Sequence, residues 1–237
     1  MNSYIILLTA LLPIVILVFY IYYKDKNSPE PVGQLVKAFL FGVLSVPLSL
    51  CLSVPFELIG LYSTEMTSIL GSVSTAFFGA AIPEEFAKFF MLWLFLRKNR
   101  YFDENMDGIV YAVCVSLGFA ALENVMYLFS NAETYLAVGF SRAIFAVPGH
   151  FCFGILMGYY YSLARFYPMS STKNKVLILI APIVVHGLYD SILFISNVTP
   201  AISGVLFIVF LIFCHKMWKC GSKSIKKHLS LDTECNN

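Results

Sequence analysis

The chain has 237 residues, of which 59% are hydrophobic and only 13% are charged, and its mean hydropathy is +0.77. Soluble globular domains carry roughly twice that share of charged residues, so the composition excludes a soluble globular protein and predicts an all-α, polytopic membrane protein. The formal net charge is only +2, and no soluble element carries a patch of basic and aromatic residues, so we expect no nucleic-acid partner.

Seven apolar stretches are each long enough for the ~20 residues of helix that span a bilayer. In chain order they are 4–23, 35–60, 72–96, 108–130, 136–164, 176–195 and 200–217. The first stretch has no basic leader and no Ala-x-Ala site, which predicts a retained span. The predicted organisation therefore has three parts: an N-terminal anchor with its loop (1–34), a membrane-embedded bundle (35–217, with its motifs in 72–195) and a basic tail (218–237).

Basic residues predict how these spans are oriented, because Lys and Arg in short connections stay on the cytoplasmic side. The first, third and fifth connections and the tail carry basic residues, whereas 61–71, 131–135 and 196–199 carry none. This alternation agrees with seven spans. It predicts an N-terminus outside and a cytoplasmic C-terminus.

The third span contains two adjacent carboxylates and a lysine, Glu84, Glu85 and Lys88. A charge at membrane depth costs about 2.5 to 3.5 kcal/mol, so these groups are expected to face the bundle interior. Glu84 and Lys88 are one helical turn apart and can pair. Pro83 indicates that the helix either bends or starts anew at this point. If a new helix starts there, Glu84 and Glu85 occupy its positions N2 and N3, where free backbone amides stabilise carboxylates.

Later spans carry further polar and ionisable side chains at similar depth, and we expect them to converge with Glu84 and Glu85 on one buried site. They are Glu123, Asn124 and Tyr127 in the fourth span, Arg142 and His150 in the fifth, and His186 and Asp190 in the sixth. Asp190 lies one turn after His186 and can orient its imidazole. Glu123 could instead join two helices by a hydrogen bond, and Arg142 either neutralises the carboxylates or positions a substrate.

This set of side chains is suited to activating water. Either a glutamate takes the proton from water while histidines stabilise the oxyanion, or zinc held by Glu84, Glu123, His150 and His186 lowers the pKa of a bound water. The sequence does not choose between the metal-free and the zinc mechanism. Buried Glu, His and Asp also form ion sites in transporters, and polar residues also join helices in a non-catalytic scaffold. No inverted repeat is evident, which disfavours the transporter.

The ordered motifs E-E-x-x-K (Glu84 to Lys88), F-x-x-x-E-N-x-x-Y (Phe119 to Tyr127), His150 and H-x-x-x-D (His186 to Asp190) resemble those of the PrsW family. These bacterial intramembrane proteases are related to the CAAX prenyl endopeptidase and bacteriocin-processing (CPBP) membrane proteases. The resemblance implies a multi-pass enzyme of the bacterial cell membrane that cuts a membrane-anchored anti-sigma factor on its extracytoplasmic side. That cut would begin the proteolysis that frees a sigma factor in a stress response.

The resemblance also implies roles for individual residues. Glu84 and Glu85 would supply the essential acid group, and Asp190 would support His186. Glu123, His150 and His186 would complete the catalytic site. In the wider superfamily a histidine usually stands where this chain has Glu123.

Overall fold

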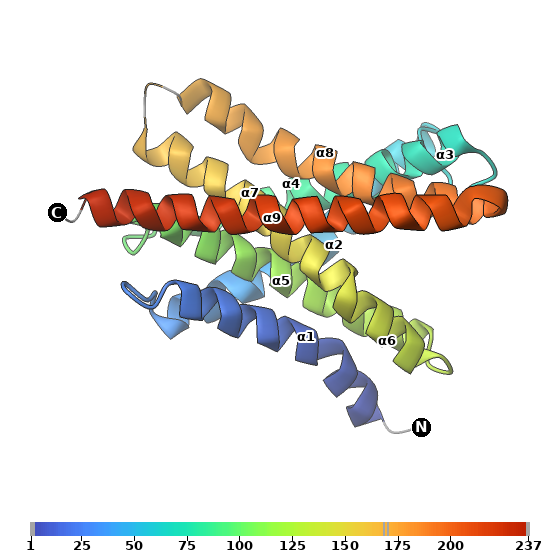
Figure 1. The fold of residues 1–237 in the computed structure, drawn as a ribbon, viewed down its shortest axis with the longest axis horizontal. Helices are drawn as coiled ribbons and strands as arrows, with labels where there is room; N and C mark the ends of the chain where they lie inside the picture. The colour runs from blue at the N-terminus through green and yellow to red at the C-terminus, as the bar shows by residue number, and fades with distance from the viewer. Residues whose placement is uncertain (1–2, 168, 170, 236–237) are drawn as a thin grey trace.

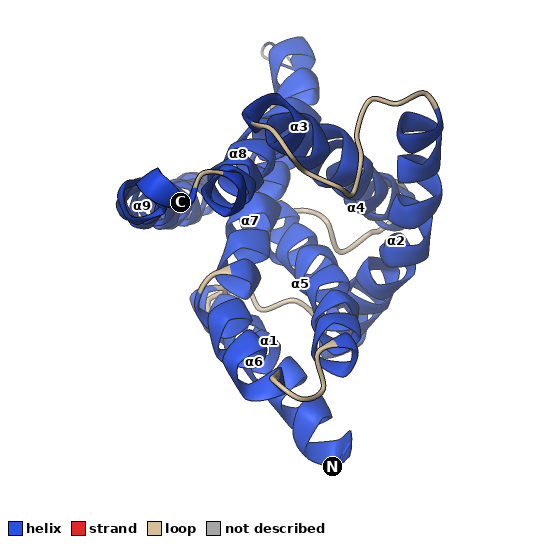
Figure 2. Cartoon of the chain, turned by 90° about the vertical axis from the view of Figure 1, so that its right-hand side faces the viewer, coloured by secondary structure: helices blue, strands red, loops and turns tan. Residues whose placement is uncertain are grey.

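The computed structural model describes residues 3–167, 169 and 171–235, and within these ranges it is helical with no strand (Figures 1 and 2). The helices are α1 (Ser3–Lys24), α2 (Val32–Leu58), α3 (Ile69–Ser74), the π-helix η1 (Thr75–Ala81), α4 (Ile82–Leu96), α5 (Asn105–Ser130), α6 (Tyr135–Ile144), α7 (Ala146–Phe166), α8 (Ser171–Val198), the 3₁₀-helix η3 (Pro200–Ile202) and α9 (Ser203–Cys235). The all-α prediction is confirmed.

Six helical stretches in the described chain are singly long and apolar enough to cross a membrane. They are Ser3–Lys24, Val32–Leu58, Asn105–Ser130, Tyr135–Phe166, Thr172–Val198 and Pro200–Glu234. The predicted third span, 72–96, differs from a single α-helix because α3, η1 and α4 follow one another through it without a loop. The polytopic membrane class is confirmed, with six candidate spanning stretches in the described chain, of which Tyr135–Phe166 joins α6 and α7 and Pro200–Glu234 joins η3 and α9.

The π-helix η1 explains how the chain accommodates Pro83. A proline ring clashes with the carbonyl four residues earlier in a regular α-helix, which here belongs to Gly79. In the structure the amide of Ile82 bonds to the carbonyl of Phe77, five residues back, and this wider turn relieves the crowding. The α-helix α4 begins at Ile82, with Pro83 at its start and both glutamates in its first turn, as one of the two predicted alternatives has it; because η1 leads into α4 without a loop, the chain stays helical through Pro83.

Helix α5 lies at the centre of the bundle, between α2, α7 and α1 (Figure 2). Every residue from Asn105 to Ala121 is buried. Small residues allow the neighbouring helices to approach, as expected where packing rather than the hydrophobic effect joins helices in lipid. Gly118 lies against the backbone of Phe39 in α2, and Gly158 in α7 lies against the backbone of Gly108. The site residues of α5 and α7 are thereby held at fixed depth.

Gly118→Val is expected to destabilise the protein by more than about 3 kcal/mol. A Cβ at this position would lie 2.0 Å from the carbonyl oxygen of Phe39, so α2 and α5 would have to separate. The free energy of unfolding can be measured by SDS titration in mixed micelles. Gly33→Ala is the control, because a Cβ there meets no atom within 4 Å; equal stability of both variants would contradict this account of the packing.

Helix α9 extends beyond the predicted last span. It runs along the outside of the bundle (Figure 2), and the segment predicted as a basic tail is helical to Cys235 (Figure 1). Asp232 accepts hydrogen bonds from the backbone amides of Asn105 (2.8 Å) and Met106 (2.9 Å), and so caps the start of α5. Residues 218–235 are thus joined to the bundle through the same helix that carries Glu123.

Candidate active site

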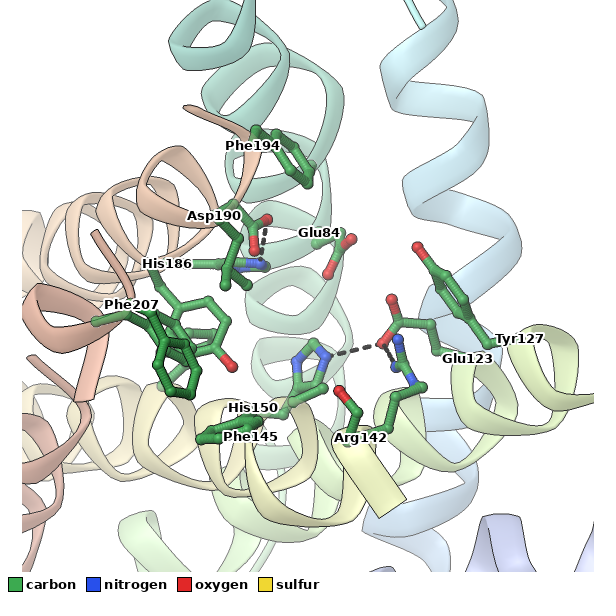
Figure 3. Close-up of a pocket in the computed structure, with 17 residues that line it drawn as sticks. Glu84, Glu123, Tyr127, Arg142, Phe145, His150, His186, Asp190, Phe194 and Phe207 are labelled. Atoms are coloured by element: carbon green, nitrogen blue, oxygen red, sulfur yellow. Dashed lines mark hydrogen bonds and ion pairs between the residues drawn. The ribbon is translucent and has the colours of Figure 1, made fainter. Parts of the chain in front are cut away.

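The six predicted catalytic residues come together from four elements. Glu84 and Glu85 lie on α4, Glu123 on α5, His150 on α7, and His186 with Asp190 on α8. All except Glu85 line one cavity of about 350 Å³, and the close-up in Figure 3 shows their polar groups facing it. The predicted convergence of these residues is therefore present in the structure.

The two adjacent glutamates have different surroundings. Glu85 is fully buried behind the cavity wall, where its Oε1 lies 2.8 Å from Lys88 Nζ and 2.9 Å from His186 Nδ1. Glu84 lines the cavity, and its side chain remains 16% exposed. Among the described residues it has one ion pair, the longer one of 3.4 Å to Lys88. Glu84 thus faces the space where a substrate would bind, and Glu85 holds the groups behind that space.

Lys88 connects three helices from a fully buried position. Its ammonium group bonds to Glu85, pairs with Glu84, and donates to His150 Nδ1 at 3.1 Å. It also lies 4.2 Å from the ring centroid of Phe119, a cation–π contact. The predicted Glu84–Lys88 pair is present, and the contact with His150 is one that helical spacing could not predict.

His150 and Glu123 form the other side of the site. Because the Lys88 ammonium can only donate, His150 Nδ1 accepts and the ring proton lies on Nε2, which donates to Glu123 Oε2 at 2.9 Å. The same oxygen accepts a hydrogen bond from Arg142 Nη2 at 2.7 Å. Both nitrogens of His150 are therefore engaged.

Two predicted supporting residues, Asn124 and Tyr127, hold Arg142 in place. Arg142 Nε donates to Asn124 Oδ1 at 2.6 Å, and Asn124 in turn donates to the carbonyl of Ala10 on α1 at 3.1 Å. The guanidinium group lies 4.1 Å from the ring centroid of Tyr127. Arg142 therefore neutralises Glu123 and still lines the cavity, so both alternatives considered for it remain compatible with its position.

His186 lies between two carboxylates. Its Nδ1 is 2.9 Å from Glu85 and its Nε2 is 3.3 Å from Asp190 Oδ2, as the one-turn spacing predicted for the latter pair. The imidazole stacks on Phe153, with ring centroids 4.5 Å apart, and this contact fixes its plane. A histidine oriented by a buried carboxylate on Nδ1 presents Nε2 to the cavity.

The cavity has an apolar side that the sequence analysis missed. Its aromatic residues come from the junction of α6 and α7 and from α7, α8 and α9, and include Phe145, Phe153, Phe194, Phe207 and Phe210. Tyr189 also lines the cavity, and its buried hydroxyl has no hydrogen-bond partner in the described structure. The spacing His150 to Phe153 and His186 to Tyr189 is three residues, a same-face signal that could have identified two of them.

The donor types at the cavity are those that a divalent metal accepts. Four carboxylates (Glu84, Glu85, Glu123 and Asp190) face two strong cations, Lys88 and Arg142, so two negative charges need compensation by protons or by a divalent ion. His186 with Glu84 and Asp190 fits a metal, because an imidazole backed by a carboxylate is a common metal ligand. His150 fits less well, because its Nδ1 accepts from the Lys88 ammonium and its Nε2 donates to Glu123, whereas His186 Nε2 faces Asp190, which could itself be a ligand.

The comparisons with known proteins place the chain in a family. A sequence model of the PrsW family intramembrane metalloproteases matches residues 30–215. The chain is 33% identical to protease PrsW of Oceanobacillus iheyensis over 93% of its own length and 98% of the relative, and 34% identical to protease PrsW of Clostridioides difficile over 94% and 91%. It is also 33% identical to protease PrsW of Bacillus subtilis over 96% and 97%. No solved structure matches it. The chain belongs to the PrsW family of intramembrane proteases and is a peptidase of the membrane.

Proposed function

We propose that Glu84 is the general base of peptide hydrolysis. The observation that carries this assignment is that Glu84 faces the cavity with one long ion pair, whereas Glu85 is enclosed between Lys88 and His186. A base must lie within hydrogen-bond reach of the water it activates, and Glu84 alone of the pair has access to that water. Glu85 acts as a positioning residue for His186.

The reaction then follows ordinary acid–base chemistry. Glu84 takes a proton from water, the hydroxide attacks the carbonyl carbon of the scissile peptide, and the proton passes from Glu84 to the leaving amine as the C–N bond breaks. Donors beside the cavity stabilise the oxyanion before that bond breaks. We assign this role to His186 and to the unpaired hydroxyl of Tyr189, which lies one turn along the same helix.

The family description names a metalloprotease, and part of the donor set suits a metal. If a metal is bound, His186, Glu84 and Asp190 are the residues that would hold it, in place of the predicted set of Glu84, Glu123, His150 and His186, and Glu84 would then be a ligand instead of the free base. A bound zinc would lower the pKa of its water and polarise the peptide carbonyl. In the described chain these donors are not gathered as a ready-made cluster. Glu123 and His150 would line the cavity beside these three residues without binding the metal.

We propose further that the substrate is a membrane-anchored anti-sigma factor cut on its extracytoplasmic side, in the bacterial cell membrane. The family similarity supports the substrate class. The alternation of basic connections supports an outside N-terminus and an outward-opening site. The aromatic side of the cavity suits an apolar side chain of the substrate next to the scissile bond.

The test is co-expression of the full chain with a doubly tagged, single-span anti-sigma factor from the same genome. We expect an extracytoplasmic fragment with the wild type and its loss with His186→Ala at equal membrane abundance. Glu57→Gln, an exposed carboxylate at the end of α2, is the matched control and should cut normally. If the protein cuts a different membrane protein and leaves the anti-sigma factor intact, the proposed substrate is wrong but the peptidase activity stands. If His186→Ala cuts as the wild type does, the proposed site is wrong.

A further inference from the structure

A second polar site lies at the end of the bundle where the C-terminus lies, on the left in Figure 1. We define the acidic cluster as Glu30 from the α1–α2 loop, Asp103 from the α4–α5 connection, and Asp107 from the first turn of α5. One oxygen of each lies within 4.8 Å of the others. Three separate segments of the chain thus bring their carboxylates to one point, far along α5 from Glu123.

The carboxylates of the acidic cluster are held by a partly buried framework. Glu30 is only 6% exposed and accepts a hydrogen bond from the hydroxyl of Tyr111. Asp107 is 1% exposed, and its Oδ2 accepts from the backbone amides of Asp103 (3.0 Å) and Glu104 (2.6 Å). Asp103 is exposed, which leaves an open side from which an ion can enter.

The negative charge of this region has no compensation within the described chain. Glu30, Asp103, Asp107 and the neighbouring Asp25 form no ion pair with any Lys, Arg or His among the described residues. Burying carboxylates without a partner is costly, so native proteins pair them or use them to coordinate metals. The acidic cluster is thus a second place in the described structure, besides the candidate active site, where carboxylates outnumber their positive partners.

Asp25 provides an independent indication that something binds there. It is 2% exposed, and its carboxylate is bound to the backbone amide of Glu30, so it lies against the acidic cluster. Its Oδ2 is buried and has no hydrogen-bond donor in the described structure. An orphaned buried oxygen next to three other carboxylates is an acceptor that a cation would satisfy.

We propose that the acidic cluster is a binding site for a hard divalent cation, Mg²⁺ or Ca²⁺, with Glu30, Asp103 and Asp107 as ligands and Asp25 beside them. The donors are all oxygen, which is the ligand type these ions prefer, and Ca²⁺–oxygen bonds of about 2.3 to 2.6 Å suit donors at this spacing. The site is distinct from the candidate active site, which mixes imidazole with carboxylate. The bound ion would tie the α1–α2 loop and the α4–α5 connection to α5.

The experiment uses the purified full chain in detergent after EDTA treatment. Tb³⁺, which takes oxygen ligands as Ca²⁺ does and luminesces when a nearby tyrosine is excited, is titrated and then displaced with Mg²⁺, Ca²⁺, Mn²⁺ or Zn²⁺. We expect Tb³⁺ emission that saturates as Tb³⁺ is added and that falls when Mg²⁺ or Ca²⁺ displaces the Tb³⁺. We also expect weaker Tb³⁺ emission in Tyr111→Phe. At 100 times its Kd, the displacing ion should raise Tm by about 5 to 10 °C.

Asp103→Asn is the main variant, because Asp103 is exposed and its side chain can be changed with the least risk to the fold; Glu57→Gln is the control. We expect Asp103→Asn to weaken cation binding at least 10-fold and Glu57→Gln to leave it unchanged. The proposal is overturned if only Zn²⁺ displaces the bound Tb³⁺, or if Asp103→Asn binds the cation as tightly as the wild type does. Should that variant not fold, failure of both Mg²⁺ and Ca²⁺ to displace Tb³⁺ from the wild type overturns it equally.

Discussion

Glu84→Gln is expected to lower the rate of substrate cleavage by about 1,000-fold without loss of the folded protein. Glutamine keeps the size and polarity of the side chain but cannot take a proton from water, and general base catalysis contributes roughly 100- to 10,000-fold. Since Glu84 keeps only a 3.4 Å pair with Lys88, its replacement leaves the stronger Lys88–Glu85 pair intact. The measurement is the fragment yield per unit of folded enzyme over time.

Glu85→Gln is the comparison that makes this prediction specific. Glu85 bonds to both Lys88 and His186 and does not line the cavity, so its loss should lower membrane abundance and stability together with activity. If Glu85→Gln removes activity in a fully stable protein while Glu84→Gln retains it, the roles of the two glutamates are reversed.

Lys88→Met is expected to destabilise the protein by about 3 to 5 kcal/mol, the largest effect on stability that we predict. Lys88 is 1% exposed and neutralises Glu85, which is 0% exposed; removing one partner leaves an uncompensated buried charge. The contact with His150 would also be lost. The free energy of unfolding, measured by SDS titration in mixed micelles, reports the change.

The double variant Lys88→Met with Glu85→Gln provides the control. It removes both charges of the pair, so it should recover part of the stability lost in Lys88→Met alone, and the difference gives the coupling energy. Stability in Lys88→Met within about 0.5 kcal/mol of the wild type would contradict a structural role for this ion pair.

The sequence by itself determined the membrane class, the helical fold and the identity of the polar residues. Apolar stretches of spanning length require helices in lipid, since every backbone polar group must bond within its own segment. Charges such as those of Glu84 and Lys88 are too costly to face lipid, so their convergence in the interior could be predicted before any helix was placed. Local spacing also predicted the Glu84–Lys88 and His186–Asp190 pairs, because residues four apart share a helix face.

Only the tertiary structure decided which partners these groups have across helices. Helical phase separates Glu84 from Glu85 by about 100° but does not say which one faces the cavity; the packing of α4 against α2, α5 and α8 does. The contact of Lys88 with His150 and the acidic cluster around Glu30 both depend on segments far apart in the chain. Such contacts depend on the distance between neighbouring helices and on their relative positions along the helix axes. The periodicity of residues within one segment does not contain this information.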